Sequence, residues 1–145
     1  IANLNGNVDT RIKKLNDGKY DCIILAKAGC ERLELDLNYS ELDHLTSISQ
    51  GSICLRFNKK REGILHLLEP FNDSEMKRKI NECNHFLNLI DADCNSAVAV
   101  DYMGEVLQAE VYGKKEFIKF SGVNAEEAFM RFEELDGLRL LNEHS

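Results

Sequence analysis

The chain has 145 residues, with 18 Lys and Arg against 25 Asp and Glu, and its formal net charge is −7. This acidic balance argues against a general binder of nucleic acids or acidic membranes, although a few arginines can still hold a small anion. Hydrophobic residues make up 43% and charged residues 30%, as in an ordinary globular protein. No apolar run approaches the roughly 20 residues that span a bilayer, so we expect no membrane segment.

The 5 cysteines and 4 histidines do not form a metal-binding pattern. No two cysteines have CxxC spacing and no two histidines share a metal-ligand spacing, so we predict no metal site. Cys22 and Cys54 lie in apolar runs, which predicts small buried hydrophobic side chains. This usage is typical of a reduced, intracellular protein.

The first part of the chain predicts helices and isolated strands. Residues 9–17 form a predicted helix, with Asp9 as its cap and Gly18 after its end. The apolar run 22–26 predicts a buried strand of a parallel or mixed sheet, and 28–35 a short helix. This order indicates part of an α/β domain, because one strand makes no sheet. Residues 48–57 predict a further strand, and 58–62 a charged linker.

The second part predicts a self-contained α+β domain over residues 63–145. A long helix opens after Pro70 and has one apolar face, made of Met76, Ile80, Cys83, Phe86, Leu87 and Ile90. The segments 97–100, 105–112 and 116–120 predict three short antiparallel strands, separated by Gly104 and 113–115. Asn124 caps a last helix with Glu127 in the capping-box position. We expect its apolar face to hold Phe129, Phe132, Leu135 and Leu138, and we expect Phe117 and Phe120 in the core.

Many positions match one family pattern in register. The matches begin with the run 6–11, Gly-Asn-Val-Asp-Thr-Arg, and continue at Lys14, Leu15, Gly18, Tyr20, Asp21, the run 23–26, Ala28, Gly29, Arg32 and Leu33. Later matches are Gln50-Gly51, the run 68–73, and Phe86-Leu87 followed by Cys94. This set resembles hydroxymethylbilane synthase (porphobilinogen deaminase), whose first pattern is RGNVxTRLxKLDxGxYDAIILAxAGLxRL. The resemblance covers nearly all of this chain, but only about the second half of the family's sequence.

The resemblance implies a fold and a domain order. Residues 1–45 would be the second half of a periplasmic-binding-protein-like α/β domain, and 46–60 a return strand and linker. Residues 63–145 would be a small α+β domain with a three-stranded antiparallel sheet and helices. The chain starts with Ile1 instead of Met, so we expect a fragment, inactive alone. The family's catalytic aspartate lies in its first half, so no catalytic residue is predicted here.

The resemblance also implies a function. The family joins four porphobilinogen units into a linear tetrapyrrole and releases ammonia, in porphyrin and heme biosynthesis. A dipyrromethane cofactor, bound through a cysteine thioether, primes the chain. Cys94 matches the attachment cysteine, and Arg11 and Arg32 match arginines that bind the carboxylates of cofactor and substrate. Arg11 would also lie in the first turn of its helix, where free N–H groups favour an anion.

The implied partners are porphobilinogen and polypyrrole intermediates, without nucleic acid or membrane. The protein is expected to be a monomer in the cytoplasm, or in an organelle if a targeting segment precedes this chain. The alternative for Arg11 and Arg32 is a pair of surface arginines bound to nearby acids. The alternative for Cys94 is a bystander thiol, whose pKa Asp91 and Asp93 would raise.

The departures from the family pattern support a second hypothesis, a degenerate non-catalytic relative that serves as a binding or interaction module. Asn5 replaces an arginine, Cys83 and Asn84 replace a glutamate and an arginine, and Ala92 and Asp93 replace two glycines. Losing those glycines changes how closely a cofactor can approach the backbone. A third hypothesis, an unrelated α/β fragment, must treat the match over 6–33 as chance.

Overall fold

The computed structural model describes residues 2–58, 60–61, 63–93 and 95–143. Contacts divide the chain into two compact units, Ile1–Leu42 and Asp43–Ser145. Each unit is described by itself below. The predicted domain limits, 1–45, 46–60 and 63–145, stay a prediction.

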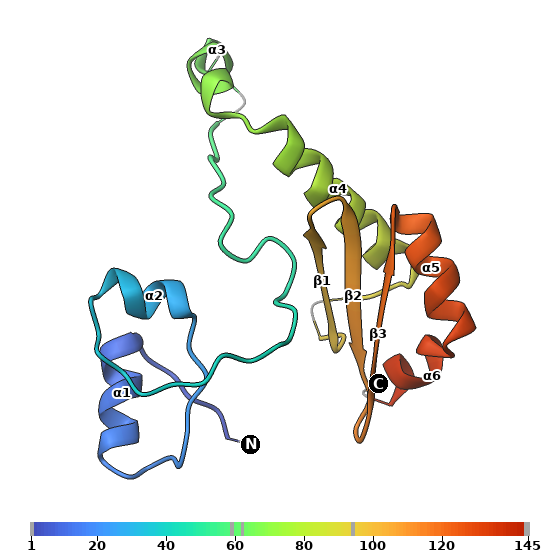
Figure 1. Cartoon of the computed structure of the whole chain (residues 1–145). Coiled ribbons are helices and arrows are strands. Elements are labelled where there is room, and N and C mark those ends of the chain that lie inside the picture. Colours follow the sequence, from blue (N-terminus) through green and yellow to red (C-terminus); the bar gives the residue numbers. More distant parts are fainter. Residues whose placement is uncertain (1, 59, 62, 94, 144–145) are drawn as a thin grey trace. The chain divides into compact units, whose positions relative to one another are not determined.

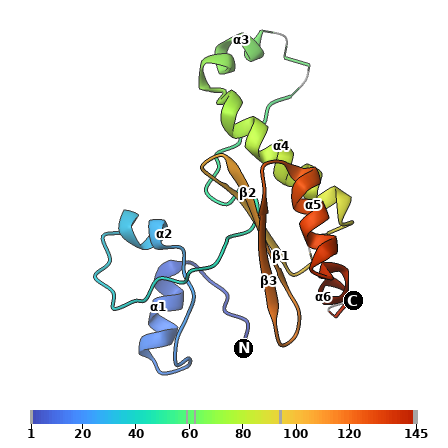
Figure 2. The same cartoon turned by 45° about the vertical axis from the view of Figure 1, so that its right-hand side comes forward.

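The first unit holds two short helices, α1 (Val8–Asn16) and α2 (Lys27–Arg32). Figures 1 and 2 both show α2 next to the N-terminal end of α1. Asn7 caps α1, since its side chain accepts a hydrogen bond of 2.9 Å from the Thr10 amide. The prediction of Asp9 as the cap was therefore wrong, because Asp9 lies inside the first turn. Gly18, with φ +70°, follows the helix end as predicted.

Two predicted strands are absent from the described residues. Residues 22–26 are irregular, with Cys22 exposed and Ile24 75% exposed. Residues 48–57 form no strand either, and Ile53 is 93% exposed and Cys54 is exposed. The predictions of two strands and of buried Cys22 and Cys54 were therefore wrong. A strand needs a hydrogen-bonded neighbour, and no described segment of the chain pairs with either run.

The second unit contains the sheet and most of the helices. Its first regular elements are helical: α3 (Ile64–Leu68), the 3₁₀ turn η1 (Glu69–Phe71) and α4 (Ser74–Leu89). The strands β1 (Val98–Met103), β2 (Val106–Tyr112) and β3 (Phe117–Gly122) follow, and then α5 (Ala125–Glu134) and α6 (Gly137–Asn142). β2 lies between β1 and β3 and pairs antiparallel with both. The predicted three-stranded antiparallel sheet with helices is confirmed.

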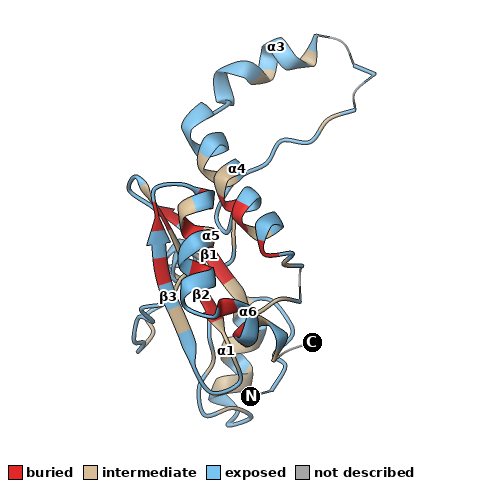
Figure 3. Ribbon diagram, turned by 90° about the vertical axis from the view of Figure 1, so that its right-hand side faces the viewer, coloured by how far each residue is buried: buried red, intermediate tan, exposed pale blue. Residues whose placement is uncertain are grey.

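The core of the second unit lies between one face of this sheet and the helices α4 and α5. Val100, Ala109 and Phe120 form one row across the three strands and are all buried. Phe86 of α4 is fully buried, and its ring centroid lies 5.8 Å from that of Phe120 and 6.4 Å from that of Phe132 on α5. Figure 3 shows the buried residues gathered on the facing sides of α4, the sheet and α5. Burial of these rings, together with the aliphatic side chains around them, stabilises the unit through the hydrophobic effect.

The helix boundaries follow from their caps. Asp73 accepts from the Met76 amide at 2.9 Å and opens α4. Asn124 accepts from the Glu127 amide at 2.9 Å, and Glu127 in turn accepts from the Val123 amide at 3.0 Å. The predicted cap pairing of Asn124 with Glu127 is therefore confirmed.

The predicted apolar positions were partly wrong. Asp136 has a left-handed φ of +55° and separates α5 from α6, so the expected single helix face is broken. Leu135 and Leu138 are therefore 45% and 56% exposed. Phe117, expected in the core, is 46% exposed. It lies two residues before Lys119 on β3, so strand alternation places its side chain on the sheet face opposite to that of Phe120.

Cys83 is the buried cysteine of α4. It is only 2% exposed, and burial, with Asp101 and Glu82 nearby, raises the pKa of its thiol to about 12. A thiol in this state is not a nucleophile at neutral pH.

We predict that replacing Gly122 with alanine destabilises the protein. A Cβ at Gly122 would lie 2.4 Å from the backbone nitrogen of Ala128, and backbone cannot move aside as a flexible side chain can. Gly122→Ala should lower the free energy of unfolding by about 1–3 kcal/mol. Ser121→Ala, on the exposed neighbour, should change it by less than about 0.5 kcal/mol. Chemical denaturation measures both, and equal midpoints would contradict the close packing of β3 and α5.

Thiol labelling of the native protein should distinguish the exposed cysteines from the buried one by their reaction rates. We expect iodoacetamide at pH 8 to modify exposed Cys22 and Cys54 much faster than buried Cys83. Peptide mass spectrometry after timed quenching gives each rate, and labelling of the unfolded protein is the control. A native rate at Cys83 equal to that at Cys22 would contradict the core described above.

Candidate functional site

Arg11 lies on α1 and is held by the segment before the helix. Its Nε donates to the Gly6 carbonyl at 2.8 Å, and its amide donates to the Asn7 carbonyl at 3.0 Å. Within the described ranges Arg11 forms no ion pair with a carboxylate. The alternative of a surface arginine bound to a nearby acid is therefore not observed for Arg11. Its terminal guanidinium nitrogens stay available to a ligand.

Residues 3–6 are held by three side chains, two from α1 and one from the segment that follows it. Besides Arg11, Lys14 donates to the Asn5 carbonyl at 2.9 Å and Tyr20 to the Asn3 carbonyl at 3.0 Å. Gly6 has a φ of +118°, and a Cβ there would lie 2.8 Å from a methyl carbon of Thr10. The matched run 6–11 therefore has a structural reason, since it shapes the turn that orients the Arg11 guanidinium.

The N-terminus of α1 is less suited to an anion than the sequence suggested. The Arg11 amide is already bonded within the helix, and the Asn7 side chain takes the Thr10 amide. Asp9 adds a negative charge in the first turn. Any carboxylate bound here would thus rely on the guanidinium of Arg11 and not on the helix end.

Arg32 lies in the last turn of α2 and is exposed. Over the part of the chain that the structure describes, its side chain has neither a hydrogen-bond partner nor an ion-pair partner. Lys27 of the same helix differs, because it pairs with Glu41 and lies 5.9 Å from the Tyr39 ring centroid. The first unit therefore carries both Arg11 and Arg32 as guanidinium groups without a carboxylate partner.

The predicted attachment residue, Cys94, lies outside the described residues. Its neighbour Asp93 accepts hydrogen bonds from the Asn95 amide at 2.8 Å and from the Ser96 amide at 2.9 Å. The Asn95 amide, followed by the Ser96 hydroxyl, lowers the pKa of Asp93, which stays ionised. Asp93, which replaces a glycine of the family pattern, therefore stabilises this turn through its hydrogen bonds. The expected effect of Asp91 and Asp93 on the Cys94 thiol stays a prediction.

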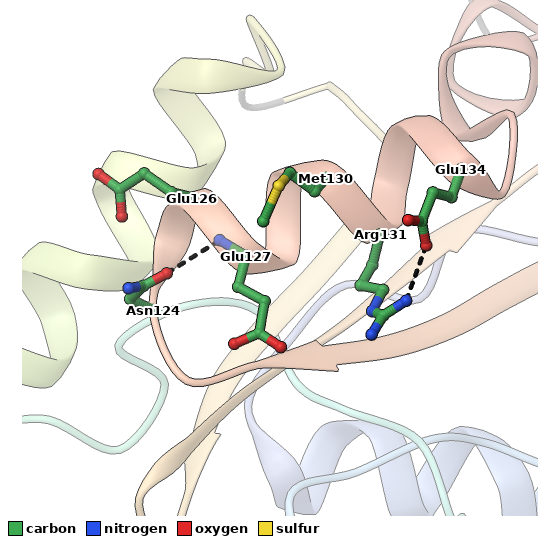
Figure 4. A pocket seen from close by; sticks show the side chains of 6 residues that line it. All are labelled: Asn124, Glu126, Glu127, Met130, Arg131 and Glu134. Carbon is green, nitrogen blue, oxygen red and sulfur yellow. Dashed lines mark hydrogen bonds and ion pairs between the residues drawn. The ribbon is translucent and has the colours of Figure 1, made fainter.

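A shallow depression along α5 does not suit the implied ligand. Its lining is Asn124, Glu126, Glu127, Met130, Arg131 and Glu134 (Figure 4). It offers three carboxylates, and Arg131 is already paired with Glu134 at 2.8 Å. A ligand with several carboxylates would be repelled. Nor do the described residues form a cluster of His, Cys, Asp and Glu that could hold a metal ion.

The donor chemistry of the first unit does fit a dipyrromethane. Such a group carries carboxylate arms, and a guanidinium binds a carboxylate with two parallel hydrogen bonds. Arg11 and Arg32 supply two such groups. In the portion of the chain described, no helix is long and apolar enough to cross a membrane.

Comparison with known proteins shows what the first part of the chain resembles. Residues 1–66 match a family model described as porphobilinogen deaminase, dipyromethane cofactor binding domain. The matched region includes Arg11 and Arg32 and ends before Cys94.

Several curated porphobilinogen deaminases align with the chain. That of Roseiflexus sp. (strain RS-1) is 38% identical over 102 residues, which are 68% of this chain and 34% of the relative. That of Streptococcus sanguinis (strain SK36) is 31% identical over 138 residues, 86% of this chain and 45% of the relative. A probable porphobilinogen deaminase of Methanocaldococcus jannaschii is 35% identical over 104 residues, 70% and 32% of the two chains.

The chain spans less than half the length of these relatives. The motifs found in the sequence agree with these alignments and with the match of the first 66 residues. The chain is therefore a divergent relative of the porphobilinogen deaminases.

Proposed function

We propose that the whole protein to which these residues belong is a hydroxymethylbilane synthase. This transferase joins four porphobilinogen units into a linear tetrapyrrole and releases ammonia at each step. The observation that supports the proposal best lies in the matched region 1–66. There Arg11 and Arg32 carry guanidinium groups that no described carboxylate neutralises.

The two arginines would bind the carboxylates of the pyrroles. Porphobilinogen carries an acetate and a propionate, so each added unit brings two negative charges to the site. A guanidinium holds a carboxylate in a fixed plane, which both binds and orients it. The bond from Arg11 Nε to the Gly6 carbonyl leaves the terminal nitrogens for this contact.

Cys94 is the proposed attachment point of the cofactor. The dipyrromethane, when bound, supplies the primer to which porphobilinogen units are joined. A thioether needs a thiol that can become a thiolate, and buried Cys83 does not meet this need. Arg11 and Arg32 would hold the carboxylate arms of the same group.

The finer organisation is also proposed. Residues 1–45 would complete a periplasmic-binding-protein-like α/β domain and 46–60 would connect it to the rest of the protein, while 63–145 would form the cofactor-attachment domain. No catalytic residue is assigned in these 145 residues, and the chain alone would be inactive. The protein would work as a monomer in the cytoplasm.

A non-catalytic relative is the second candidate. Asn5, Asn84 and Asp93 stand where the family pattern has an arginine, an arginine and a glycine. Asn5 and Asn84 are both exposed, so neither change is compensated by a new buried contact. The first experiment below separates the two candidates.

Intact mass spectrometry of the whole protein tests the cofactor. In a host that supplies porphobilinogen, we expect wild type to carry an added mass of two porphobilinogen units less their ammonia. Cys94→Ala should lack this mass and the matched control Cys22→Ala should keep it, because only one thiol would form the thioether. An unmodified wild-type protein would favour the non-catalytic relative.

Substitution of the two arginines tests carboxylate binding. Arg11→Gln and Arg32→Gln should each lower kcat/KM for porphobilinogen about 10- to 100-fold, because each removes a charge-assisted hydrogen bond. Lys13→Gln, an exposed change on the same helix as Arg11, should have little effect. Thermal unfolding of each variant controls for stability. Wild-type kinetics in both arginine variants would contradict their assigned role.

A further inference from the structure

Glu110 is a buried carboxylate on the sheet face opposite to the helices. It lies in one row with Ala99 and Lys119, next to the core row of Val100, Ala109 and Phe120. The alternation of a strand therefore points Glu110 away from the core. Such a face is normally solvated, yet Glu110 is 0% exposed. A buried carboxylate needs hydrogen-bond partners.

Residues 43–48, here called the sheet strap, supply part of this cover. The Leu45 amide donates to Glu110 Oε2 at 3.1 Å, and His44 Nδ1 lies 3.3 Å from the same oxygen. The His44 ring also packs edge-on against Phe117, with 5.4 Å between ring centroids. Ile48 packs against the buried core cluster. The strap thus reaches β2 and β3 from far away in the sequence.

The sheet supplies the other partners of Glu110. The Tyr112 hydroxyl donates to Oε2 and lies 3.2 Å from His44 Nδ1, while Lys119 Nζ lies 3.0 Å from Oε1. Burial tends to raise the pKa of Glu110, but the hydrogen bond from Tyr112, the ammonium of Lys119, and the contacts with the Leu45 amide and His44 lower it on balance. Burial, together with Glu110, raises the pKa of Tyr112, so its hydroxyl remains a donor.

The contacts of the strap are few compared with those of the sheet. Residues 43–47 have no regular secondary structure, whereas β2 is hydrogen-bonded on both sides. If the strap leaves the sheet, water can replace the Leu45 amide and His44 at Glu110, and Tyr112 and Lys119 stay in place. Release of the strap should therefore require far less free energy than opening of the sheet.

We propose that the sheet strap is a reversible latch, with Glu110 as the positioning residue that holds residues 43–48 on the sheet. Its release would free residues 43–48 from the sheet while the sheet and its helices stay folded. The strap directly follows Leu42, the last residue of the first unit. The latch would thus set how much free chain joins the unit that carries Arg11 and Arg32 to the sheet.

Hydrogen exchange of the whole protein, followed by mass spectrometry, tests the latch. Glu110→Gln removes the charge that the strap binds, and His44→Ala removes a strap contact without altering the sheet. Among the described contacts, Leu45 is the strap residue whose amide donates a hydrogen bond, so in both variants we expect the Leu45 amide to exchange at least about tenfold faster than in wild type. Amides of β1 and β2 should keep their wild-type rates. Glu105→Gln, at an exposed glutamate of the β1–β2 turn, is the matched control and should change neither set.

Two results would overturn the proposal. A Leu45 amide that keeps its wild-type rate in both variants would show that Glu110 does not hold the strap. Leu45 and sheet amides that accelerate together would show that Glu110 stabilises the whole sheet and that no separate latch exists. If Glu110→Gln does not fold, His44→Ala decides between these results alone, because it leaves every residue of the sheet in place.

Discussion

The second unit depends on the packing of three aromatic rings between one sheet face and two helices. Phe86, Phe120 and Phe132 come from α4, β3 and α5, and their mutual contacts place both helices on the same side of the sheet. This packing explains why β3 needs Gly122 where α5 approaches, and why Cys83 is buried and unreactive. On the opposite sheet face, the described residues of the second unit that contact Glu110 belong to the strap 43–48 and to the sheet itself.

The two units hold their functional side chains in different ways. None of the described residues of the first unit is fully buried, so the placement of Arg11 comes from local bonds. Its guanidinium is oriented by the Gly6 carbonyl, and the segment before Gly6 is held by hydrogen bonds from Lys14 of α1 and from Tyr20. Local hydrogen bonds of this kind can position a side chain without a hydrophobic core, but they leave it more mobile than packing does.

The sequence predicted the second half of the chain well because its signals are local. Helical periodicity, the Asn124 cap and the glycine turn at Gly104 each act within a few residues. The strands expected at 22–26 and 48–57 failed because a strand also depends on a partner, which an apolar run cannot specify. Nothing in the sequence indicated that Glu110 is buried, because strand alternation places it on the polar sheet face. Part of its burial comes from residues 43–48, which are far away in the sequence. The assignment of Arg11, Arg32 and Cys94 as site residues rests on the family resemblance alone. Their spacing by itself would have predicted ordinary surface residues.

The most direct test of the account is the reaction of the purified whole protein with porphobilinogen. Consumption of porphobilinogen and release of ammonia would be followed together, with a heat-denatured sample as the blank. The account predicts one ammonia released for each porphobilinogen consumed, with a linear tetrapyrrole as the product. A folded protein that consumes no porphobilinogen would contradict it and would leave a binding module on a deaminase fold.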